Sequence, residues 1–427
     1  MNNTFSKELY DKIYRNISNK LVTGSDRINK EKFEKEYNEN FEIINYKINN
    51  MTYQFTRFEK KERNGRYVYI PTIRDKIVIE YLKWNLQKKF KIRMQSRDEI
   101  ISELRCLLKE PINYTVIRLD IKSFFNNIDH GILINKLKKS SLCTTQEFYL
   151  IKCILENTGI GVPQGLSISN YLAEIFMESF DIRLRKLNDR ISYYARYVDD
   201  IIMVIPGKMT TFEFNEIETS IKDLFSRYNL SLNENKTQYI YWGLKPDSKF
   251  EYLGYTFTKP GKDLVMGIAS DKMGKLFNKA DHIFDSFSSD NNFQLLYERV
   301  KIFTSVNLLY KTSYNETAGY YTKPIIFGIN YDYRFVSSKY INRINSYLKR
   351  KIIHNINMDR KEKRMLYALL VKQPDEKYRI IVYSKIKLMT LKSVVYKMYN
   401  GAFLWSDIMC MKRKELVNLY FALAKYY

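Results

Sequence analysis

The sequence predicts an α+β fold, with strands and helices mixed over roughly the first 260 residues and a mostly helical, basic region after them. Short apolar runs rich in β-branched and aromatic residues, at 115–121, 191–197 and 201–205, are typical of buried strands. Helical periodicity separates these runs, and strand signals fade after about residue 268. No repeat or Pro/Gly/Ser-rich linker divides the chain, which has 15 Gly and 8 Pro in 427 residues.

Each expected element has a local reason. Apolar residues spaced three and four apart predict helices, short alternating or continuous apolar runs predict strands, and an Asn-Gly pair between alternating segments predicts a hairpin. Helices are expected over 5–22, 31–48, 74–92, 95–109, 131–139, 145–157, 167–187 and 212–228. Strands are expected over 115–121, 191–197, 201–205, 237–242 and 250–257, with a hairpin over 55–70 turning at Asn64-Gly65.

Composition excludes several classes of protein. Hydrophobic residues make up 45% and charged residues 28%, a globular composition that argues against disorder. There is no apolar run long enough to span a membrane, and the start MNNTFSKELYDKIYRN lacks the apolar segment of a signal peptide. The four cysteines form no CxxC pair and there are three histidines, which argues against disulfide, zinc and His-rich sites. A reducing, cytoplasmic location is expected.

Charge and aromatic content indicate a nucleic-acid partner. Lys and Arg number 71 against 47 Asp and Glu, a net charge of +24, which suits a polyanion. The 36 Tyr, 25 Phe and 3 Trp include rings suited to stacking on unpaired bases. Core packing and an AT-rich genome also account for such a composition, so it favours nucleic-acid binding without proving it.

Three carboxylates stand out. Asp120 ends the apolar run VIRLD, while Asp199 and Asp200 lie between two apolar strands in YARYVDDIIMVI. Buried, adjacent acidic groups are unfavourable unless positive charge compensates them. Two divalent cations would do so, and nucleotidyl transfer requires two. An ordinary β-turn is the alternative interpretation of the Asp-Asp pair.

Six blocks in order resemble the reverse transcriptase family. They are RYVYIPTIRDKIVIEYL (66–82), RLDIKSFFNNIDH (118–130), GVPQGLSISNYLAEIFM (161–177), YVDD (197–200), LSLNENKT (230–237) and FEYLGYTF (250–257). The resemblance covers about 66–257, weakens in the thumb and ends near residue 345. It implies a right-hand polymerase with fingers, an antiparallel palm sheet and a thumb.

The resemblance also implies a domain plan. Fingers and palm would occupy 1–262, with the palm at about 114–130 and 180–262. A helical thumb would follow at 263–345 and a helical, basic extension at 346–427. The extension could pack on the thumb, bind RNA or mediate oligomerisation.

Catalytic residues carry over from the matching blocks. Asp120 and Asp199 would bind two Mg²⁺ ions, with Mn²⁺ as the alternative, while Asp200 is more peripheral and the Ile121 carbonyl adds a ligand. Lys236 would protonate the leaving pyrophosphate.

Substrate-binding residues carry over in the same way. Phe125 would act as the steric gate against a ribose 2′-OH, unless its ring is simply core. Gln164 and Gly165 would shape the nascent base-pair pocket. Lys61 and Arg66 resemble the cations that clamp the triphosphate, and Arg74 competes for that role.

Nucleic-acid contacts are expected in two regions. Arg196, beside the aspartates, would contact a primer or template phosphate or else be structural, and Tyr252 and Gly254 lie in the block that grips the primer. A basic run without acidic residues would line the template or product, or be a solvated face: Lys339, Arg343, Lys349, Arg350 and Lys351.

The sequence Leu166 to Met177 after PQG resembles bacterial abortive-infection and other phage-defence reverse transcriptases. That branch implies RNA-directed DNA synthesis with a dedicated structured noncoding RNA, DNA product and dNTPs as partners, no membrane, and homo-oligomers as an alternative state. Untemplated or tyrosine-primed synthesis, for which Tyr426 and Tyr427 are among the candidate tyrosines, stays open. So do a retron enzyme and an RNA-binding scaffold with a vestigial site.

Overall fold

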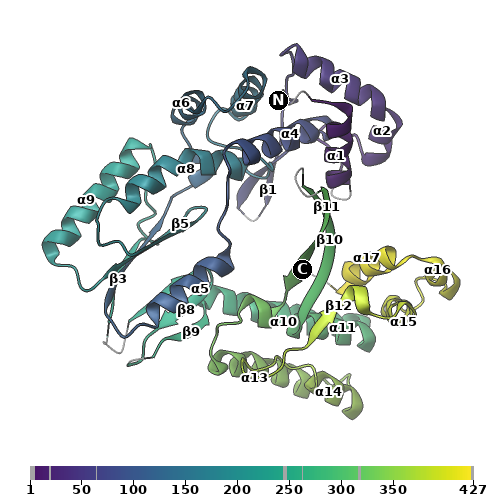
Figure 1. The fold of residues 1–427 in the computed structure, drawn as a ribbon. Coiled ribbons are helices and arrows are strands. Elements are labelled where there is room, and N and C mark those ends of the chain that lie inside the picture. The colour runs from purple at the N-terminus through teal and green to yellow at the C-terminus, as the bar shows by residue number, and fades with distance from the viewer. Residues whose placement is uncertain are drawn as a thin grey trace. The chain divides into compact units, whose positions relative to one another are not determined.

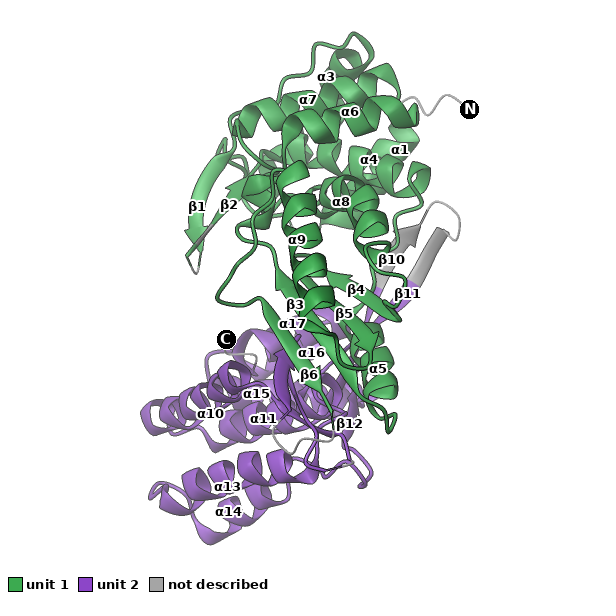
Figure 2. Ribbon diagram, turned by 90° about the vertical axis from the view of Figure 1, so that its left-hand side faces the viewer, with its two compact units in different colours: residues 1–243 green, residues 244–427 purple. Residues whose placement is uncertain are grey.

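The structure, a computed structural model, describes residues 5–18, 21–63, 65–243, 248–261, 263–315 and 319–424. The chain forms two compact units, residues 1–243 and 244–427 (Figure 2). The first unit ends before the expected fingers-and-palm boundary at residue 262. The segment expected to close the palm after residue 243 therefore belongs to the second unit. Asn64, Tyr426 and Tyr427 lie outside the described residues.

The first unit is a mixture of helices and antiparallel strands (Figure 1). Its helices are α1 (Lys7–Ile17), α2 (Lys30–Lys35), α3 (Tyr37–Asn49), α4 (Ile73–Lys89), α5 (Arg97–Leu108), η2 (Phe124–Asn127), α6 (His130–Ser140), α7 (Thr145–Thr158), α8 (Ser169–Arg185) and α9 (Thr211–Arg227). Its strands are β1 (Glu59–Arg63), β2 (Arg66–Ile70), β3 (Tyr114–Asp120), β4 (Tyr193–Tyr197), β5 (Asp200–Pro206) and β6 (Gln238–Trp242).

Local sequence signals explain most of these boundaries. Three helices, α5, α7 and α9, begin with a capping box, in which a hydroxyl and a glutamate three residues later satisfy each other's backbone N–H groups. The pairs are Ser96 with Glu99, Thr144 with Glu147, and Thr210 with Glu213. The single helix expected over 31–48 is wrong, because it breaks at Glu36 into α2 and α3.

The fingers hairpin expected over 55–70 forms from β1 and β2. These strands pair antiparallel, with Arg63 opposite Arg66, so a two-residue turn joins them. Gly65 in that turn has a φ of +72°, which glycine adopts without a steric penalty.

A four-stranded antiparallel sheet, in the order β4-β5-β3-β6, lies at the centre of the first unit. Alternate residues point to opposite faces of a strand. Ile117 and Leu119 of β3, with Met203 and Ile205 of β5, belong to the large apolar core that also includes α8 and α9. That burial fixes the register, since a one-residue slip would expose these side chains.

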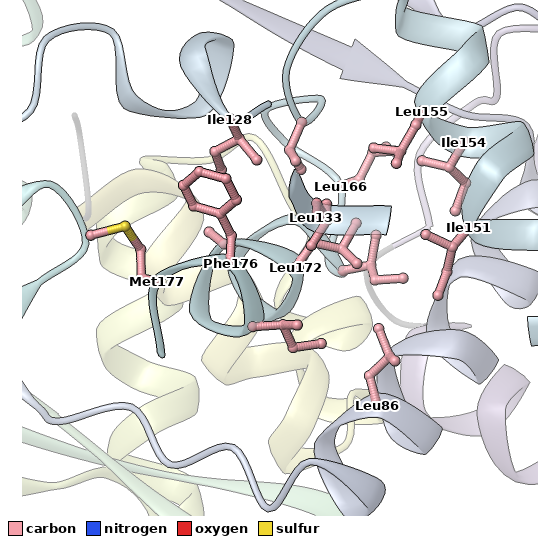
Figure 3. Close-up of a cluster of buried hydrophobic side chains, with 14 of the residues drawn as sticks. Leu86, Ile128, Leu133, Ile151, Ile154, Leu155, Leu166, Leu172, Phe176 and Met177 are labelled. Carbon is pink, nitrogen blue, oxygen red and sulfur yellow. The ribbon is translucent and has the colours of Figure 1, made fainter. Parts of the chain in front are cut away.

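The same core continues beneath the loop that precedes α8. Figure 3 shows Leu86 of α4, Leu133 of α6 and Ile154 of α7 around Leu166 and the α8 side chains. All are buried. The core thus fixes the 161–168 loop relative to the helices around it.

The second unit has α-helices of 4 to 21 residues as well as strands. Its helices are α10 (Ser270–Asp290), α11 (Phe293–Thr304), α12 (Ile329–Asp332), α13 (Ser338–His354), α14 (Arg360–Tyr367), η3 (Tyr383–Lys385), α15 (Leu388–Tyr399), α16 (Trp405–Cys410) and α17 (Arg413–Ala424). Its strands are β7 (Lys249–Tyr252), β8 (Tyr255–Thr258), β9 (Val265–Ile268), β10 (Val306–Asn315), β11 (Gly319–Phe327) and β12 (Ile380–Val382).

Two expectations for this unit are wrong in part. The strand expected over 250–257 is two strands, because Leu253 and Gly254 have φ values of 45° and 81° and turn the chain between β7 and β8. The expected helical thumb at 263–345 contains the long antiparallel hairpin β10–β11. Its Val, Tyr, Thr and Ile residues favour extended backbone, and their strand partner lies only a short turn away.

The C-terminal extension packs on α11. Leu295 and Ile302 of α11 share an apolar cluster with Leu391, Leu416 and Tyr420 of α15 and α17. The phenol of Tyr420 donates a hydrogen bond of 2.7 Å to the buried Glu298 of α11.

None of the helices in the described part of the chain combines the length and the apolar character needed to span a membrane.

The root of the β10–β11 hairpin is rigid. The buried amide of Asn307 donates to the carbonyls of Ile302 (2.8 Å) and Ser305 (3.0 Å) and accepts from the Tyr383 hydroxyl (2.9 Å). Gly328, directly after β11, has a φ of +122°, and a Cβ there would lie 2.0 Å from the Ser305 carbonyl oxygen. Only glycine fits at this position.

We expect Gly328→Ala to lower the free energy of unfolding by about 3 kcal/mol or more, because the added methyl group meets backbone that cannot move freely. Gly401→Ala is the control: Gly401 has a φ of +88° but open space around it, so about 1 kcal/mol is expected. Urea unfolding of both variants measures the difference. Equal losses would show that the hairpin root is not tightly packed.

Candidate active site

The three aspartates lie at one end of the central sheet. Asp120 ends β3 and is opposite Asp200, the first residue of β5, in the antiparallel register. The backbone N–H of Ile121 donates a 3.0 Å hydrogen bond to the Asp199 carbonyl. Asp120 is 3% exposed. Pairing of β3 with β5 therefore places carboxylates from distant parts of the sequence side by side.

The turn between β4 and β5 is strained. Val198, directly before Asp199, has a φ of +60°, which is rare for a β-branched residue and unfavourable by about 1–3 kcal/mol. Surrounding structure must hold such a conformation in place.

Arg196 supplies that support. Its guanidinium donates to the Val198 carbonyl (3.0 Å) and to the carboxylates of Glu174 and Asp181 on α8, so that all of its N–H groups are used. Its side chain is 4% exposed. These contacts favour the structural alternative for Arg196, and a contact with a nucleic-acid phosphate stays a prediction. Arg196 is a positioning residue for the turn.

Lys236 and Asn233 both contact Asp120. The Lys236 ammonium lies 3.0 Å from Asp120 Oδ2, and the Asn233 amide donates to Oδ1 at 2.9 Å. The backbone N–H of Asn233 also donates to the Asp120 carbonyl at 2.8 Å. The 230–237 block is thus fastened to the end of β3, where Lys236 is 54% exposed and can reach a substrate.

Arg118 and Asp200 form a second ion pair. Arg118 Nε and Nη2 donate to the two Asp200 oxygens at 3.0 and 3.2 Å, and both side chains are mostly buried. Sequence reasoning missed Arg118 and Asn233. Strand alternation could have found Arg118, because residues two apart on β3 share a face with Asp120. No sequence pattern indicated Asn233.

The electrostatics of the trio follow from this arrangement. Burial raises the pKa of Asp199 above its ordinary value, and the charges of Asp120 and Asp200 raise it as well, while Lys236 lowers it. Burial also raises the pKa of Asp200, against the hydrogen bonds and charge of Arg118. Asp199 is therefore the carboxylate for which an added cation would relieve most repulsion.

The Gly159–Gly165 loop packs on the segment that carries Phe125. The Val162 N–H donates to the Phe125 carbonyl at 2.7 Å, and a Cβ on Gly161 would lie 2.3 Å from that same oxygen. The Phe125 ring is half-buried beside Phe124. Backbone contact with a glycine therefore fixes the position of Phe125 close behind Asp120 in the chain.

The other end of this loop contacts the fingers hairpin. The Tyr69 N–H of β2 donates to the Gln164 carbonyl at 2.8 Å. Gly165 has a φ of +94°, and a Cβ there would lie 2.3 Å from the Val68 side chain. The loop thus joins β2 to the Phe125 segment, so that Phe125, Gln164 and Gly165 belong to one connected structure.

The sequence over residues 58–257 matches the family described as reverse transcriptase (RNA-dependent DNA polymerase). These residues form a reverse transcriptase domain. The segment contains the fingers hairpin, the antiparallel palm sheet, Asp120, Asp199, Asp200 and Lys236, and the predicted fold class is confirmed. The match covers a little under half of the chain. No curated protein matches the sequence.

Solved telomerase structures show a distant similarity. Apo telomerase from Candida tropicalis has a TM-score of 0.40 and 12% identity over 86% of this chain and 68% of that one. A C-terminally truncated form has 0.37 and 13%, covering 57% and 62%. Telomerase from Candida albicans with a TWJ fragment of telomeric RNA has 0.38 and 13%, covering 78% and 57%. The chain thus spans 57–68% of these proteins' lengths, and their activity is not transferred to it.

The predicted metal site of the reverse transcriptase domain has suitable ligand chemistry. Within the described parts of the chain, no three His, Cys, Asp or Glu side chains are already arranged to hold a metal ion. The carboxylates of Asp120 and Asp199 and the Ile121 carbonyl are hard oxygen donors, and burial together with the neighbouring carboxylates raises the pKa of Asp199. These residues fit a divalent cation once the Lys236 side chain moves away from the Asp120 carboxylate that it contacts.

The predicted triphosphate clamp is spread over the fingers. Lys61 is on exposed β1 and lies 3.3 Å from Glu59. Arg74 is half-buried in the first turn of α4. Burial raises the pKa values of Tyr53 and Tyr10, and the charge of Arg74 opposes that rise. Arg66 begins β2, and its side chain lies outside the described part of the structure. Each of these roles stays a prediction.

The other predicted nucleic-acid contacts differ in exposure. Tyr252 is 1% exposed, and its contact with a primer stays a prediction. Gly254 forms the β7–β8 turn. On α13, Lys351 lies 2.5 Å from Asp281 of α10, which ties it to its neighbour. Lys339, Arg343, Lys349 and Arg350 are exposed, and stay candidates for phosphate contacts.

We expect Asp199→Asn to raise the melting temperature by about 1–3 °C at neutral pH without divalent cations. Because the folded-state pKa of Asp199 lies above its unfolded value, the folded protein binds the proton more tightly, and stability falls as pH rises through that window. The variant's advantage should shrink as the pH falls toward the pKa of an ordinary carboxyl. Added Mg²⁺ should stabilise the parent protein and not the variant. The same Mg²⁺ response in both proteins would rule out Asp199 as a ligand.

We expect Arg118→Met to lower the free energy of unfolding by about 3 kcal/mol, because it leaves the buried Asp200 carboxylate without its guanidinium partner. Asp200→Asn should restore much of that loss in the same chain, giving a coupling energy of about 2 kcal/mol in a double-mutant cycle. The control is Arg93→Met, where the side chain is 86% exposed and a change within about 0.5 kcal/mol is expected. Additive effects at 118 and 200 would contradict the pairing.

Proposed function

We propose that this protein is an RNA-directed DNA polymerase that extends DNA by two-metal nucleotidyl transfer. The observation that carries the proposal is the set of the buried Asp120 and the half-buried Asp199 and Asp200 at one end of the palm sheet of a reverse transcriptase domain. A dead site would gain nothing from three repelling carboxylates, since apolar or neutral residues there would be more stable. This argues for an enzyme rather than a scaffold.

Each residue has a role in that reaction. Asp120, Asp199 and the Ile121 carbonyl would hold Mg²⁺, with Mn²⁺ as the alternative. Bound cations of this kind activate the attacking 3′ oxygen and neutralise charge on the phosphates. Asp200, held by Arg118, keeps the turn in register and adds negative charge. Lys236 is exposed next to Asp120, where it would donate a proton to the leaving pyrophosphate.

Substrate selection follows from the loop that holds Phe125. A ring in this position would exclude a ribose 2′-OH and thereby select deoxynucleotides. Gln164 and Gly165, pinned to β2, would shape the pocket for the new base pair. Lys61, Arg66 and Arg74 are the cations available in the fingers to hold the triphosphate.

The biological setting is proposed from the sequence resemblance. The continuation after PQG, Leu166 to Met177, is similar to bacterial phage-defence reverse transcriptases. We infer a role in antiphage defence in the cytoplasm, with a dedicated structured noncoding RNA as template. The net charge of +24 supports a nucleic-acid partner.

The test is incorporation of labelled dNTPs by the purified protein with Mg²⁺, with co-purifying RNA identified and the product sequenced. The Asp199→Ala, Asp200→Ala variant should lose at least about 100-fold in rate. Glu216→Ala, Asp223→Ala is the matched control, because it removes two exposed acidic residues from α9 and should keep full activity.

The product sequence separates the alternatives. DNA complementary to one discrete bound RNA would establish templated synthesis and identify the template. Low-complexity DNA without a matching RNA would replace the proposal with untemplated synthesis. No aspartate-dependent product would overturn the polymerase assignment and favour the scaffold.

A further inference from the structure

His130 begins α6, directly after the segment that carries Phe125. Its Nε2 atom lies 2.6 Å from the carbonyl oxygen of Gly161. A carbonyl oxygen accepts hydrogen bonds and cannot donate them, so the imidazole is the donor and carries a proton on Nε2. The ring therefore joins the start of α6 to the Gly159–Gly165 loop.

The loop is fastened to the Phe125 segment at two adjacent residues. Gly161 accepts from the His130 ring, and the next residue, Val162, donates its N–H to the Phe125 carbonyl at 2.7 Å. Gly161 has a φ of +58°, and a Cβ there would lie 2.3 Å from the Phe125 carbonyl oxygen. Glycine therefore lets backbone pack on backbone here, and the His130 hydrogen bond holds the two segments in that contact.

The imidazole projects from a fixed position. Ile128 and Leu133, on either side of it in the chain, are buried in the core shown in Figure 3. Asp129 caps the first turn of α6 and also accepts a hydrogen bond of 2.9 Å from the Asn229 side chain. These contacts restrict movement of His130 relative to the core, so its hydrogen bond transmits that restriction to the loop.

Other elements hold the rest of the loop. The Ser169 hydroxyl of α8 donates to the Pro163 carbonyl, and the Tyr69 N–H of β2 donates to the Gln164 carbonyl at 2.8 Å. Three loop carbonyls thus each accept from a different element. The carbonyl held by the imidazole belongs to the residue just before the one that contacts Phe125.

Sugar selection by an aromatic ring depends on where the ring lies. A ribonucleotide differs from a deoxynucleotide by one hydroxyl group, and an apolar site rejects an added hydroxyl by only about 100-fold. Groups that perform such a selection must be held within about 0.5 Å of their working position. The Phe125 ring is half-buried, so its backbone contact with the loop adds to the constraint that the core supplies.

We propose that His130 is a positioning residue for sugar selection: by holding Gly161, it keeps the Phe125 ring where that ring excludes a ribose 2′-OH. The inference rests on the proposed function, because it concerns the expected steric gate of the same reaction. His130 acts through the loop and not by contact with the nucleotide. The alternative is that its hydrogen bond only stabilises the fold, in which case loss of the bond would leave sugar selection unchanged.

The test compares incorporation of a dNTP with that of the matching rNTP by variants of the whole chain, on a defined RNA template with a DNA primer. His130→Ala should lower the ratio of the two kcat/KM values about ten-fold, because the gate ring is free to move aside for the extra hydroxyl. His130→Gln should keep most of the selection, since its amide can donate to the Gly161 carbonyl in place of Nε2. His282→Ala is the control, because it removes an exposed histidine from α10 and should leave the ratio unchanged.

Phe125→Ala separates this inference from the proposed function. It should reduce selection at least as much as His130→Ala, and combining the two should reduce selection no further, because the imidazole acts through the ring. Unchanged selection in Phe125→Ala would overturn the expected steric gate and the role of His130 with it. Selection that falls in Phe125→Ala and not in His130→Ala would overturn the role of His130 alone, as would additive losses in the double variant.

Amide hydrogen exchange measures the positioning without catalysis. The Val162 N–H should exchange about five-fold faster in His130→Ala, because its hydrogen bond to Phe125 opens more often, and His130→Gln should restore its protection. Mass spectrometry of a peptide covering 159–168 reports this amide. Unchanged exchange would overturn the coupling between His130 and the Phe125 segment, whether or not the protein shows polymerase activity.

A further variant separates the hydrogen bond from the bulk of the side chain. His130→Phe keeps a ring at this position and removes the donor, so it should match His130→Ala in both selection and exchange. Selection like that of the parent protein in His130→Phe would show that packing alone positions the loop, and would overturn the proposal. Melting temperatures of all variants identify any loss of fold, and the comparison of His130→Phe with His130→Gln stands even where His130→Ala is unstable.

Discussion

The antiparallel pairing of β3 with β5 is the constraint on which the rest of the site depends. It places Asp120 opposite Asp200 and ties the Ile121 N–H to the Asp199 carbonyl. Carboxylates held side by side repel one another, and burial together with this repulsion raises the pKa of Asp199 and Asp200. Sheet pairing and the apolar core beneath it supply the free energy that holds them together. The free energy that keeps the active-site carboxylates in place therefore comes from packing elsewhere in the first unit.

Neighbouring residues limit that repulsion in different ways. Lys236 and Asn233 contact Asp120 from the 230–237 block, and Arg118 neutralises Asp200 from within β3 itself. Arg196 does not touch the carboxylates but holds the strained turn before Asp199. Of the three aspartates, Asp199 has the fewest direct side-chain contacts that offset its negative charge. This asymmetry distinguishes the carboxylate most suited to a metal ion from the one kept apart by an arginine.

Sequence reasoning recovered most of the catalytic domain, because its signals are local. Helical periodicity, the Asn-Gly pair and the β-rich run that ends at Asp120 depend on neighbouring residues only. It failed where long-range contacts decide the outcome. The burial of Arg196 depends on Glu174 and Asp181 from α8. The Asn233 contact depends on a loop folding back over more than a hundred residues, which no local pattern encodes.

The thumb shows the same limit. In residues 306–327, apolar and polar residues alternate too irregularly for the sequence to distinguish a strand from a helix. The structural role of the buried Asn307 at the hairpin root depends on its hydrogen-bond partners Ile302 and Tyr383, which the sequence alone does not identify. Tyr252 lies in the block expected to grip the primer, and its side chain is buried. Exposure is a property of the folded chain, which a motif match cannot supply.

The division of labour between the two units has an evolutionary consequence. The three aspartates and the cationic side chains that contact them all come from residues 1–243. Helix α13 and the β10–β11 hairpin come from residues 244–427. Substitutions on the surface of the second unit can therefore accumulate without disturbing the balance of charge around the aspartates. Lineages that share one catalytic apparatus would be free to diverge in the nucleic acid they accept, by changing a few exposed lysines, arginines and tyrosines.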